Sequence, residues 1–445
     1  MRRTIAATII CALFSFTHDA LASGFRLMEV DNVGQGMAHA RVAGVDDAAA
    51  VYYNPAAMSE IEKYSAKAGF QYSDPKTKLD HASGPEETVN ETLPVPHLYS
   101  VSKLEDMGIS VGMGIFSNFG QAVSWEIDSP VRHVATDTKL KTYTVNASAA
   151  MSLELLSIGV GVNYMTVHAE YDNVHSYTGL GGDGYSLVDV SGSTVGFNVG
   201  LLMKLTDAIK IGATYRSAMT GDLSGKVDME NIPGYDATAH RARMLAGQAS
   251  SGTTPPSGGD SGPGSTRDDY KSDADTSFKF PAIASAGINL NVTDALSVEF
   301  DVDYTQWSAF EEITFNFASP LSHDGHEVLP SSVTYKQNWK DTTTLKVGAA
   351  FKIDPQMTFR CGFIVDPSPV PDSTFSPRTP DADRNVVTVG FGYKASDNYT
   401  VDASFAYIMM GDRAVSNDVG SPNDNVSGTY STTANIFGVS VGYTF

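Results

Sequence analysis

The strongest constraint on this chain is an alternation of apolar with small or polar residues at every second position. At the C-terminal end the apolar members of the alternation are Phe437, Val439, Val441, Tyr443 and Phe445. Gly, Ser and Thr occupy the positions between them, and successive side chains of a β-strand point to opposite faces. The same pattern recurs in the ranges 159–164, 387–393 and 401–407. The chain is therefore expected to form β-strands with one apolar face.

The composition of the other face separates two classes of β protein. A soluble sandwich turns its polar face to water, whereas here that face carries Gly, Ser, Asn and Asp, which leave space inside a barrel. Charged residues make up 18% of the chain, below the roughly 25% of soluble domains. No run of about 18 apolar residues follows Ala22, which excludes membrane-spanning helices. The pattern predicts an all-β fold, a transmembrane antiparallel β-barrel.

The connections between strands alternate in length, as expected of periplasmic turns and extracellular loops. Short turns are predicted near residues 105–106, 155–156, 206–207, 293–294, 354–355 and 396–397. Longer connections are predicted at about 75–94, 119–139, 171–190, 223–277, 317–335, 367–382 and 411–429. This arrangement gives a 14-stranded barrel over residues 63–445 with both ends on the periplasmic side.

The first 22 residues have the layout of a secretory signal peptide. Arg2 and Arg3 precede an apolar run, and Ala20 to Ala22 form a small-residue cleavage site. The run is too short to span a bilayer, so we expect export and a final location in the bacterial outer membrane. The chain ends on Phe445 at the close of an amphipathic strand, which resembles the terminal signal that barrel-assembly machinery reads.

Charge and cysteine content exclude several other classes of protein. The formal net charge of −21 argues against nucleic-acid binding, which needs a basic face. Cys361 is the single cysteine outside the signal peptide, so a disulfide framework and a cysteine-based zinc site are both excluded. The sequence indicates no cofactor and no metal site.

Residues 23–62 lack the alternating pattern and are too apolar to remain a free tail. The segment contains Asp46 and Asp47, and Asn54 is placed to cap a short helix with Pro55 at its first position, before Ala56. Because a barrel of 14 strands has a lumen that is either a channel or filled, we expect this segment to be an N-terminal hatch inside the barrel.

A series of short motifs extends along essentially the whole chain: Gly24-Phe25, Asp46-Asp47, Asn54-Pro55-Ala56, Ser117-Asn118-Phe119-Gly120, Gly196-Phe197-Asn198, Thr214-Tyr215-Arg216-Ser217, Trp307-Ser308, Trp339-Lys340-Asp341 and Thr358 to Arg384. Taken together and in this order, they resemble the outer-membrane long-chain fatty acid and hydrocarbon transporter family (FadL/TodX type). The resemblance implies passive uptake of hydrophobic molecules, most of all long-chain fatty acids, across the outer membrane.

In such transporters the ligand is caught among the outer loops and passes to an internal pocket lined partly by the hatch. It then leaves sideways through a gap in the barrel wall. The resemblance places this lateral exit at a kink formed by Ser117, Asn118, Phe119 and Gly120, and Gly120 weakens strand pairing there. Phe25, Leu27 and Met28 are candidates for the pocket lining, with ordinary hatch packing as the alternative.

One departure from the family leaves the ligand open. Fatty acid transporters hold the carboxylate with basic residues, one of them near the outer end of the fifth strand, where this chain has Asn173. Lys336, close to a second basic position of the family, and His168 are the nearest candidates. Because a buried carboxylate without a cation is costly, uptake of uncharged monoaromatic or alkane hydrocarbons is the alternative.

Two further classes remain as rivals. A lipase-like outer-membrane enzyme needs Ser, His and an orienting group together, and no spacing around His97, His133 or His168 singles out such a triad. An adhesin would not need a hatch. The expected partners are therefore a hydrophobic ligand, outer-membrane lipid and lipopolysaccharide, and the barrel-assembly machinery. The barrel is expected to be a monomer, since closure leaves no free strand edge for pairing with another chain. The protein is not expected to be an enzyme.

Overall fold

The computed structural model describes residues 24–89, 93–176, 183–231, 270–323, 326–417 and 426–445. The predicted signal peptide, residues 1–22, lies outside these ranges. Strands dominate, and all of them except β15 (Leu321–His323) and β16 (His326–Leu329), which pair with each other, form one antiparallel sheet. It closes on itself where β1 (Tyr64–His81) pairs with β23 (Gly428–Thr444). No helix in the described part of the chain is long and apolar enough to cross a membrane. The sheet is a closed 14-strand barrel, as the sequence predicted.

Nine of the strands that cross the barrel wall are continuous. They are β1, β3 (Leu93–Leu104), β6 (Asp137–Leu153), β7 (Leu156–Ser176), β8 (Asp183–Thr206), β19 (Met357–Asp366), β20 (Arg384–Lys394), β21 (Tyr399–Met410) and β23.

The other five crossings are each made of two consecutive pieces. They are β4 (Ile109–Phe116) with β5 (Gly120–Ser124), β9 (Ile209–Arg216) with β10 (Met219–Asn231), β11 (Tyr270–Phe280) with β12 (Ile283–Asn291), β13 (Leu296–Thr305) with β14 (Glu312–Phe317), and β17 (Ser332–Lys336) with β18 (Thr342–Lys352).

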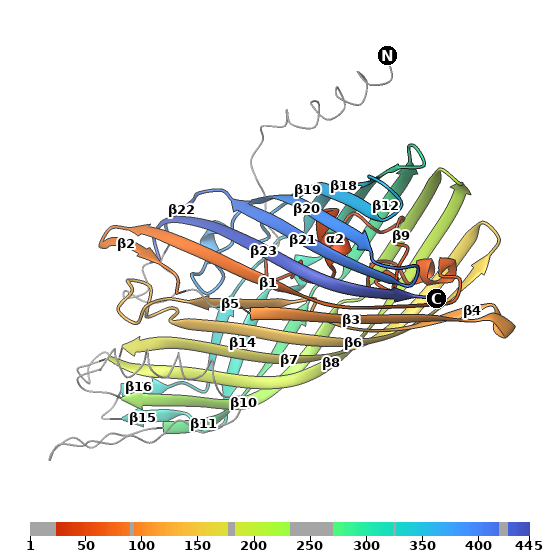
Figure 1. Cartoon of the computed structure of the whole chain (residues 1–445). Helices are drawn as coiled ribbons and strands as arrows, with labels where there is room; N and C mark the ends of the chain where they lie inside the picture. Colours follow the sequence, from red (N-terminus) through yellow and green to blue (C-terminus); the bar gives the residue numbers. More distant parts are fainter. Residues whose placement is uncertain (1–23, 90–92, 177–182, 232–269, 324–325, 418–425) are drawn as a thin grey trace.

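Short elements extend the connections. They are β2 (Gly84–Glu87), β15 (Leu321–His323), β16 (His326–Leu329), β22 (Arg413–Val415) and the 3₁₀ turns η2 (Glu105–Met107), η3 (Trp307–Ala309) and η4 (Asp372–Thr374). All six predicted short turns are present at one end, where the C terminus also lies, and the strand extensions lie at the other end (Figure 1). The strands are longer than the sequence indicated, because β7 and β8 continue through most of the connection predicted at 171–190.

The two faces of the wall follow the predicted alternation. Phe437, Val439 and Val441 are about half exposed on the outside, whereas Ile436 and Ser440 on the same strand are buried. An outer surface of exposed apolar side chains is stable against lipid hydrocarbon, and the closed sheet satisfies the backbone groups that lipid could not.

Residues 24–62 lie in the lumen, and Figure 1 shows α2 (Asn32–Gly36) enclosed by strands. α2 packs against β19, β20 and β21, whereas η1 (Pro55–Glu60) packs against β6, β7 and β8. The third short helix, α3 (Ala50–Tyr53), contacts β3, β4 and β6. The segment therefore touches the wall on opposite sides, and its alanines are fully buried.

Candidate functional site: a wall gap and a lumenal cavity

The third crossing of the wall is interrupted between β4 and β5. Both pieces pair with β6, but Ser117 to Phe119 leave the sheet. Thr142 of β6 compensates, since its carbonyl accepts a hydrogen bond from Ser117 Oγ at 2.6 Å and its own hydroxyl donates to the Phe119 carbonyl at 2.6 Å. The break therefore has its own hydrogen-bonding partners and is a built feature of the barrel.

The N-terminal segment pairs with this break from the inside. The Leu27 amide donates to the Asn118 carbonyl at 2.9 Å, and the Gly120 amide donates to the Phe25 carbonyl at 2.9 Å. Arg26 and Phe119 form an isolated antiparallel bridge between these two bonds. Residues 25–27 thus act as a three-residue strand that lies where the sheet is open.

A gap in the wall lies next to the break. β3 pairs with β4 only over residues 98–104, and residues 93–97 of β3 pair with β1 alone. This half of β3 is consequently an edge strand on the side of β5. Pro94 and Pro96 lie in it, and proline, which has no N–H to donate, is confined to edge positions of sheets. The two prolines are a sequence signal for the gap that our reading of the sequence missed.

A cavity with about 1210 Å³ of unfilled space, its open mouth included, passes through this gap. Its lining includes Phe25 and Leu27 in the lumen, Val95 and Ala122 on the two sides, and Tyr143, which is half exposed on the outer face. Because the lining runs from lumenal to lipid-facing side chains, the cavity connects the barrel interior with the membrane side. We call it the gap cavity.

Phe25 holds the N-terminal segment in this position. Its ring packs edge-on against Trp307 at a centroid distance of 4.8 Å and against Phe310 at 5.1 Å, and Phe119 and Phe278 lie within 6 Å. Phe25 is 4% exposed. Aromatic contacts of this kind add to the energy of burial, so Phe25 is the main apolar anchor of residues 24–28.

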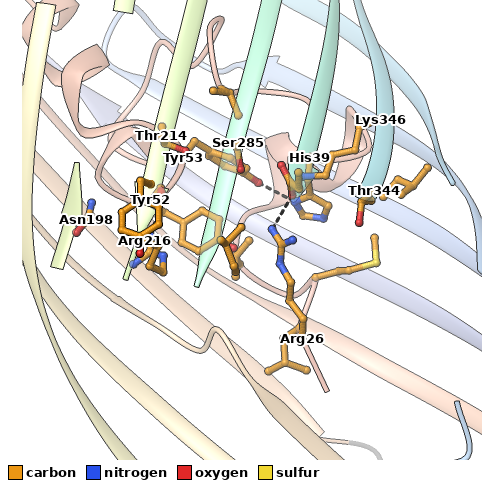
Figure 2. A pocket seen from close by; sticks show the side chains of 18 of the residues that line it. Arg26, His39, Tyr52, Tyr53, Asn198, Thr214, Arg216, Ser285, Thr344 and Lys346 are labelled. Atoms are coloured by element: carbon orange, nitrogen blue, oxygen red, sulfur yellow. Dashed lines mark hydrogen bonds and ion pairs between the residues drawn. The ribbon is translucent and has the colours of Figure 1, made fainter. Parts of the chain in front are cut away.

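A second cavity lies deeper in the lumen, with about 800 Å³ of unfilled space (Figure 2). Leu27 lines both cavities and so lies between them, whereas Met28 lines this inner cavity only. Its apolar lining also includes Val30, Val42, Val199, Ile283 and Ile364. Phe25, Leu27 and Met28 therefore each line at least one of the two cavities. That they bind a ligand stays a prediction.

Charged side chains line the inner cavity too. Asp303 accepts hydrogen bonds from Arg26 at 2.8 Å and from Lys346, and Asp366 is bonded to Arg384 at 3.0 Å. His39 lies 2.7 Å from the Tyr53 hydroxyl, and burial lowers the pKa of His39 to about 3, so that this imidazole is neutral at pH 7.

An ion-pair cluster joins the N-terminal segment to β1. Arg41 contacts Asp31 at 2.9 Å and Asp46 at 2.9 Å, and it also contacts Asp47. Lys67 of β1 contacts both Asp31 and Asp47. Although burial opposes it, the neighbouring Lys67 and Arg41 hold the pKa of Asp31 well below its usual range. Breaking a buried ion pair leaves an uncompensated charge. The cluster therefore holds the middle of the N-terminal segment, residues 31–47, firmly against β1.

The Asn54-Pro55-Ala56 turn lies against β8. Asn54 Oδ1 accepts a hydrogen bond from the Ala56 amide at 3.1 Å, and its Nδ2 donates to the carbonyls of Val42 at 2.8 Å and Leu201 at 3.0 Å. Asn54 thus caps η1, with Pro55 at the first position, in the way the sequence indicated. A Cβ on Gly200 would lie 2.1 Å from Asn54 Oδ1, so only glycine allows this contact.

Two other candidates lie elsewhere. His168 is on the outward-facing side of β7, bonded to Glu170 at 2.7 Å, and Lys336 is exposed on β17. Neither lines the gap cavity or the inner cavity. His168 has the same parity as Val162 and Tyr164, whose side chains face outward, so the alternation of β7 already assigns it to the outer face.

A cation missed in the sequence lies beside Asn173. Arg378, from the connection between β19 and β20, donates to Asn173 Oδ1 at 3.4 Å and stacks over the rings of Tyr171 and Tyr335. The fifth strand therefore has a basic side chain at its outer end, supplied by a residue more than 200 positions away. No local pattern around Asn173 could have indicated it.

A closed antiparallel barrel with an apolar outer face, a filled lumen and a gap in its wall defines an outer-membrane transport protein. The comparison of the sequence with known families agrees. Residues 13–445 match the family described as outer membrane protein transport protein (OMPP1/FadL/TodX), and the chain belongs to this family. It is a multi-pass β-barrel of the bacterial outer membrane.

Individual relatives are distant but extend over nearly the full length. The chain is 24% identical to the long-chain fatty acid transport protein of Salmonella typhi, with 90% of this chain and 91% of that protein covered. Among solved structures, a Pseudomonas aeruginosa FadL homologue has a TM-score of 0.77 at 21% identity, covering 95% and 100% of the two chains. The Pseudomonas putida toluene transporter TodX has a TM-score of 0.69 at 15% identity, covering 96% and 99%.

Proposed function

We propose that this protein takes up hydrophobic molecules, long-chain fatty acids first among them, by passive diffusion across the outer membrane. In this proposal residues 23–62 are the hatch and the remainder of the chain is the barrel. Ligand enters from the loop end, occupies the inner cavity, passes Leu27 and leaves sideways through the gap between β3 and β5. An apolar ligand that exits into lipid never crosses the aqueous end of the lumen, so no energy source is needed.

The gap cavity is the observation that carries the proposal. A closed barrel normally pairs every strand along its length, because an unpaired backbone group facing lipid is costly. Here residues 93–97 of β3 are unpaired toward β5, two of them are prolines, and a cavity lined by Phe25 and Leu27 opens at this place. A lateral exit explains why this unpaired edge exists.

Filling the gap tests the proposal. Ala122 of β5 lines the gap cavity, whereas Ala68 of β1 faces outward on an intact part of the wall. The Ala122→Trp variant should take up radiolabelled oleate much more slowly than the wild type, and Ala68→Trp should match the wild type. Both should assemble in the outer membrane at normal levels. Equal uptake by the two variants would exclude the lateral exit.

Uptake of uncharged hydrocarbons is the second candidate. It is supported by Asn173, which stands where fatty acid transporters carry a basic residue, and by the aromatic surroundings of Phe25. Arg378, whose guanidinium lies beside Asn173, weighs against it. Binding of oleate and of its methyl ester to the detergent-solubilised barrel separates the candidates, because the two ligands differ mainly in the charged head. Tighter binding of oleate supports fatty acid uptake, and equal binding supports hydrocarbons.

The proposal extends to the surroundings of the barrel. The pairing of β1 with β23 along residues 65–80 closes the sheet, which supports a monomer in contact with membrane lipid and lipopolysaccharide. Phe445 exchanges backbone hydrogen bonds with Tyr64 at 3.1 and 3.2 Å, so recognition of the C-terminal strand by barrel-assembly machinery would precede closure. We propose that the protein is not an enzyme, because its family is one of transport proteins.

A further inference from the structure

Arg216, at the end of β9, is a buried cation that lines the inner cavity and is only 9% exposed. Its guanidinium donates to Asn163 Oδ1 at 2.8 Å and to the Tyr52 carbonyl at 3.2 Å, and it lies over the rings of Tyr52 and Phe116. All these partners are neutral. Within the part of the chain that the structure describes, no carboxylate forms an ion pair with Arg216.

Each of the other charged side chains at this cavity has an ion-pair partner. Asp303 is shared by Arg26 and Lys346, and Asp366 is bonded to Arg384 and to the Thr344 hydroxyl. His39 is neutral. The described residues therefore leave a surplus of positive charge at the inner cavity, with Arg216 as its unpaired member. A buried charge without a counterion is costly, so a site that keeps one is suited to receiving an anion.

We propose that Arg216 and the inner cavity form a binding subsite for the carboxylate head of an amphiphilic ligand. The two protein hydrogen bonds use two of the five N–H donors of the guanidinium, which leaves donors for a carboxylate. The planar guanidinium matches the two oxygens of a carboxylate, and such charge-assisted bonds are stronger than neutral ones. The subsite rests on the proposed function, because it concerns the same lumenal path.

The rest of the cavity suits the apolar chain of such a ligand. Ile283 of β12, the cross-strand partner of Arg216, is buried at this end, and Leu27 and Met28 line the cavity as well (Figure 2 shows the polar groups). Since Leu27 also lines the gap cavity, a ligand anchored at Arg216 can direct its tail toward the opening between β3 and β5. The tail would then reach lipid first, and the head group would leave Arg216 last.

Binding to the full-length barrel in detergent tests the subsite, with oleate and methyl oleate as probes. The wild type should bind oleate more tightly than the ester. Arg216→Met should weaken oleate binding by about 10- to 100-fold and leave methyl oleate binding within about twofold, because only the carboxylate contact is removed. Arg216→Lys, which keeps the charge but not the paired donors, should retain part of the preference and should fold where Met does not.

Two matched variants make the outcome specific. Arg360→Met removes another inward arginine, which pairs with Asp402 at 2.8 Å and lines neither cavity, so the preference for oleate should persist. Arg378→Met removes the cation beside Asn173. If Arg378→Met abolishes the preference and Arg216→Met does not, the head group binds at the loop end and the subsite at Arg216 is wrong.

The binding experiment also separates this inference from the function on which it rests. If the wild type binds oleate and methyl oleate equally, the carboxylate subsite is excluded, while hydrophobic uptake stands. If the wild type binds neither, the proposed function itself fails. An intermediate preference with Arg216→Lys, together with its loss in Arg216→Met, supports the subsite even where the Met variant assembles poorly.

Discussion

The carbonyl of Phe25 accepts a hydrogen bond from the amide of Gly120 at 2.9 Å, which joins the N-terminal segment to the break in the third crossing of the wall. The same three-residue stretch contributes Leu27 to both cavities. One short segment thus lies at the opening in the wall and between the gap cavity and the inner cavity. Movement of residues 25–27 would change access to the gap, which in the proposed function couples the hatch to the lateral exit.

Phe25→Ala should release this segment. The substitution removes a buried ring that contacts several other aromatic rings, at a cost of about 3–5 kcal/mol, while the barrel strands keep their own pairing. Residues 25–27 should then leave the break more often, so that oleate passes with less resistance and uptake rises. Phe405→Ala, which removes a ring on the outer face of β21, is the control. Unchanged uptake in Phe25→Ala would mean that the segment does not limit passage.

We expect the free energy of unfolding to change with pH because of the protonation of Asp381. This carboxyl, in the connection between β19 and β20, accepts hydrogen bonds from the Gly24 amide at 3.2 Å and from Ser368 Oγ at 2.9 Å. Burial, partly offset by the nearby Arg384, raises the pKa of Asp381 to about 6.

A raised pKa means that the folded protein binds this proton more tightly than the unfolded chain does. The contribution of the protonated group is complete below the unfolded pKa near 4 and is lost as the pH rises through about 6, a change of about 3 kcal/mol. Relative to the wild type, Asp381→Asn should therefore gain stability between pH 4 and 6 and show a constant difference above that range. Urea unfolding followed by tryptophan fluorescence measures this, and Asp106→Asn, at an exposed position of η2, is the control. A pH-independent difference between Asp381→Asn and the wild type would contradict the assignment.

Gly200→Ala should displace the turn that begins η1. The new Cβ would lie 2.1 Å from Asn54 Oδ1 and 2.8 Å from Pro55 Cδ, too close for either to remain in place. Because Asn54 caps η1 and bonds to the wall at Leu201, the hatch should loosen there and admit small hydrophilic solutes.

Gly221→Ala is the matched control for this effect. Its Cβ would meet nothing nearer than 3.6 Å, which is ordinary van der Waals contact. Single-channel conductance in planar bilayers should rise for Gly200→Ala and stay at the wild-type level for Gly221→Ala. Equal conductance in the two variants would show that the turn is not part of the seal.

The comparison of sequence and structure separates local from non-local information. Three features depend only on residues that are neighbours in the sequence, and all three were predictable: the alternation along β23, the short turns and the Asn54 cap. The outward position of His168 was equally local, since it follows from the parity of Val162 and Tyr164. By contrast, the approach of Arg378 to Asn173 depends on how a loop folds over the barrel, and no periodicity in the sequence encodes such a contact.

The surplus charge of Arg216 is another property that emerges only in three dimensions. The sequence shows Arg216 within a motif of the family, but whether a carboxylate lies near it depends on strands far apart in the chain. Burial and pairing together, rather than residue type, distinguish Arg216 from Arg360, which has Asp402 as its partner.

Pro94 and Pro96 provide the most direct test of the gap. Replacing both with threonine restores two N–H donors to residues 93–97 of β3 and gives this stretch a residue with a high strand propensity. The edge should then pair with β5 and narrow the opening, so that oleate uptake falls while binding of oleate to the solubilised barrel persists. Pro355→Thr, in the short turn between β18 and β19 and lining neither cavity, controls for the loss of proline itself. Normal uptake in the Pro94→Thr, Pro96→Thr double variant, with protection of the new amides from hydrogen exchange, would show that the gap can close without stopping transport.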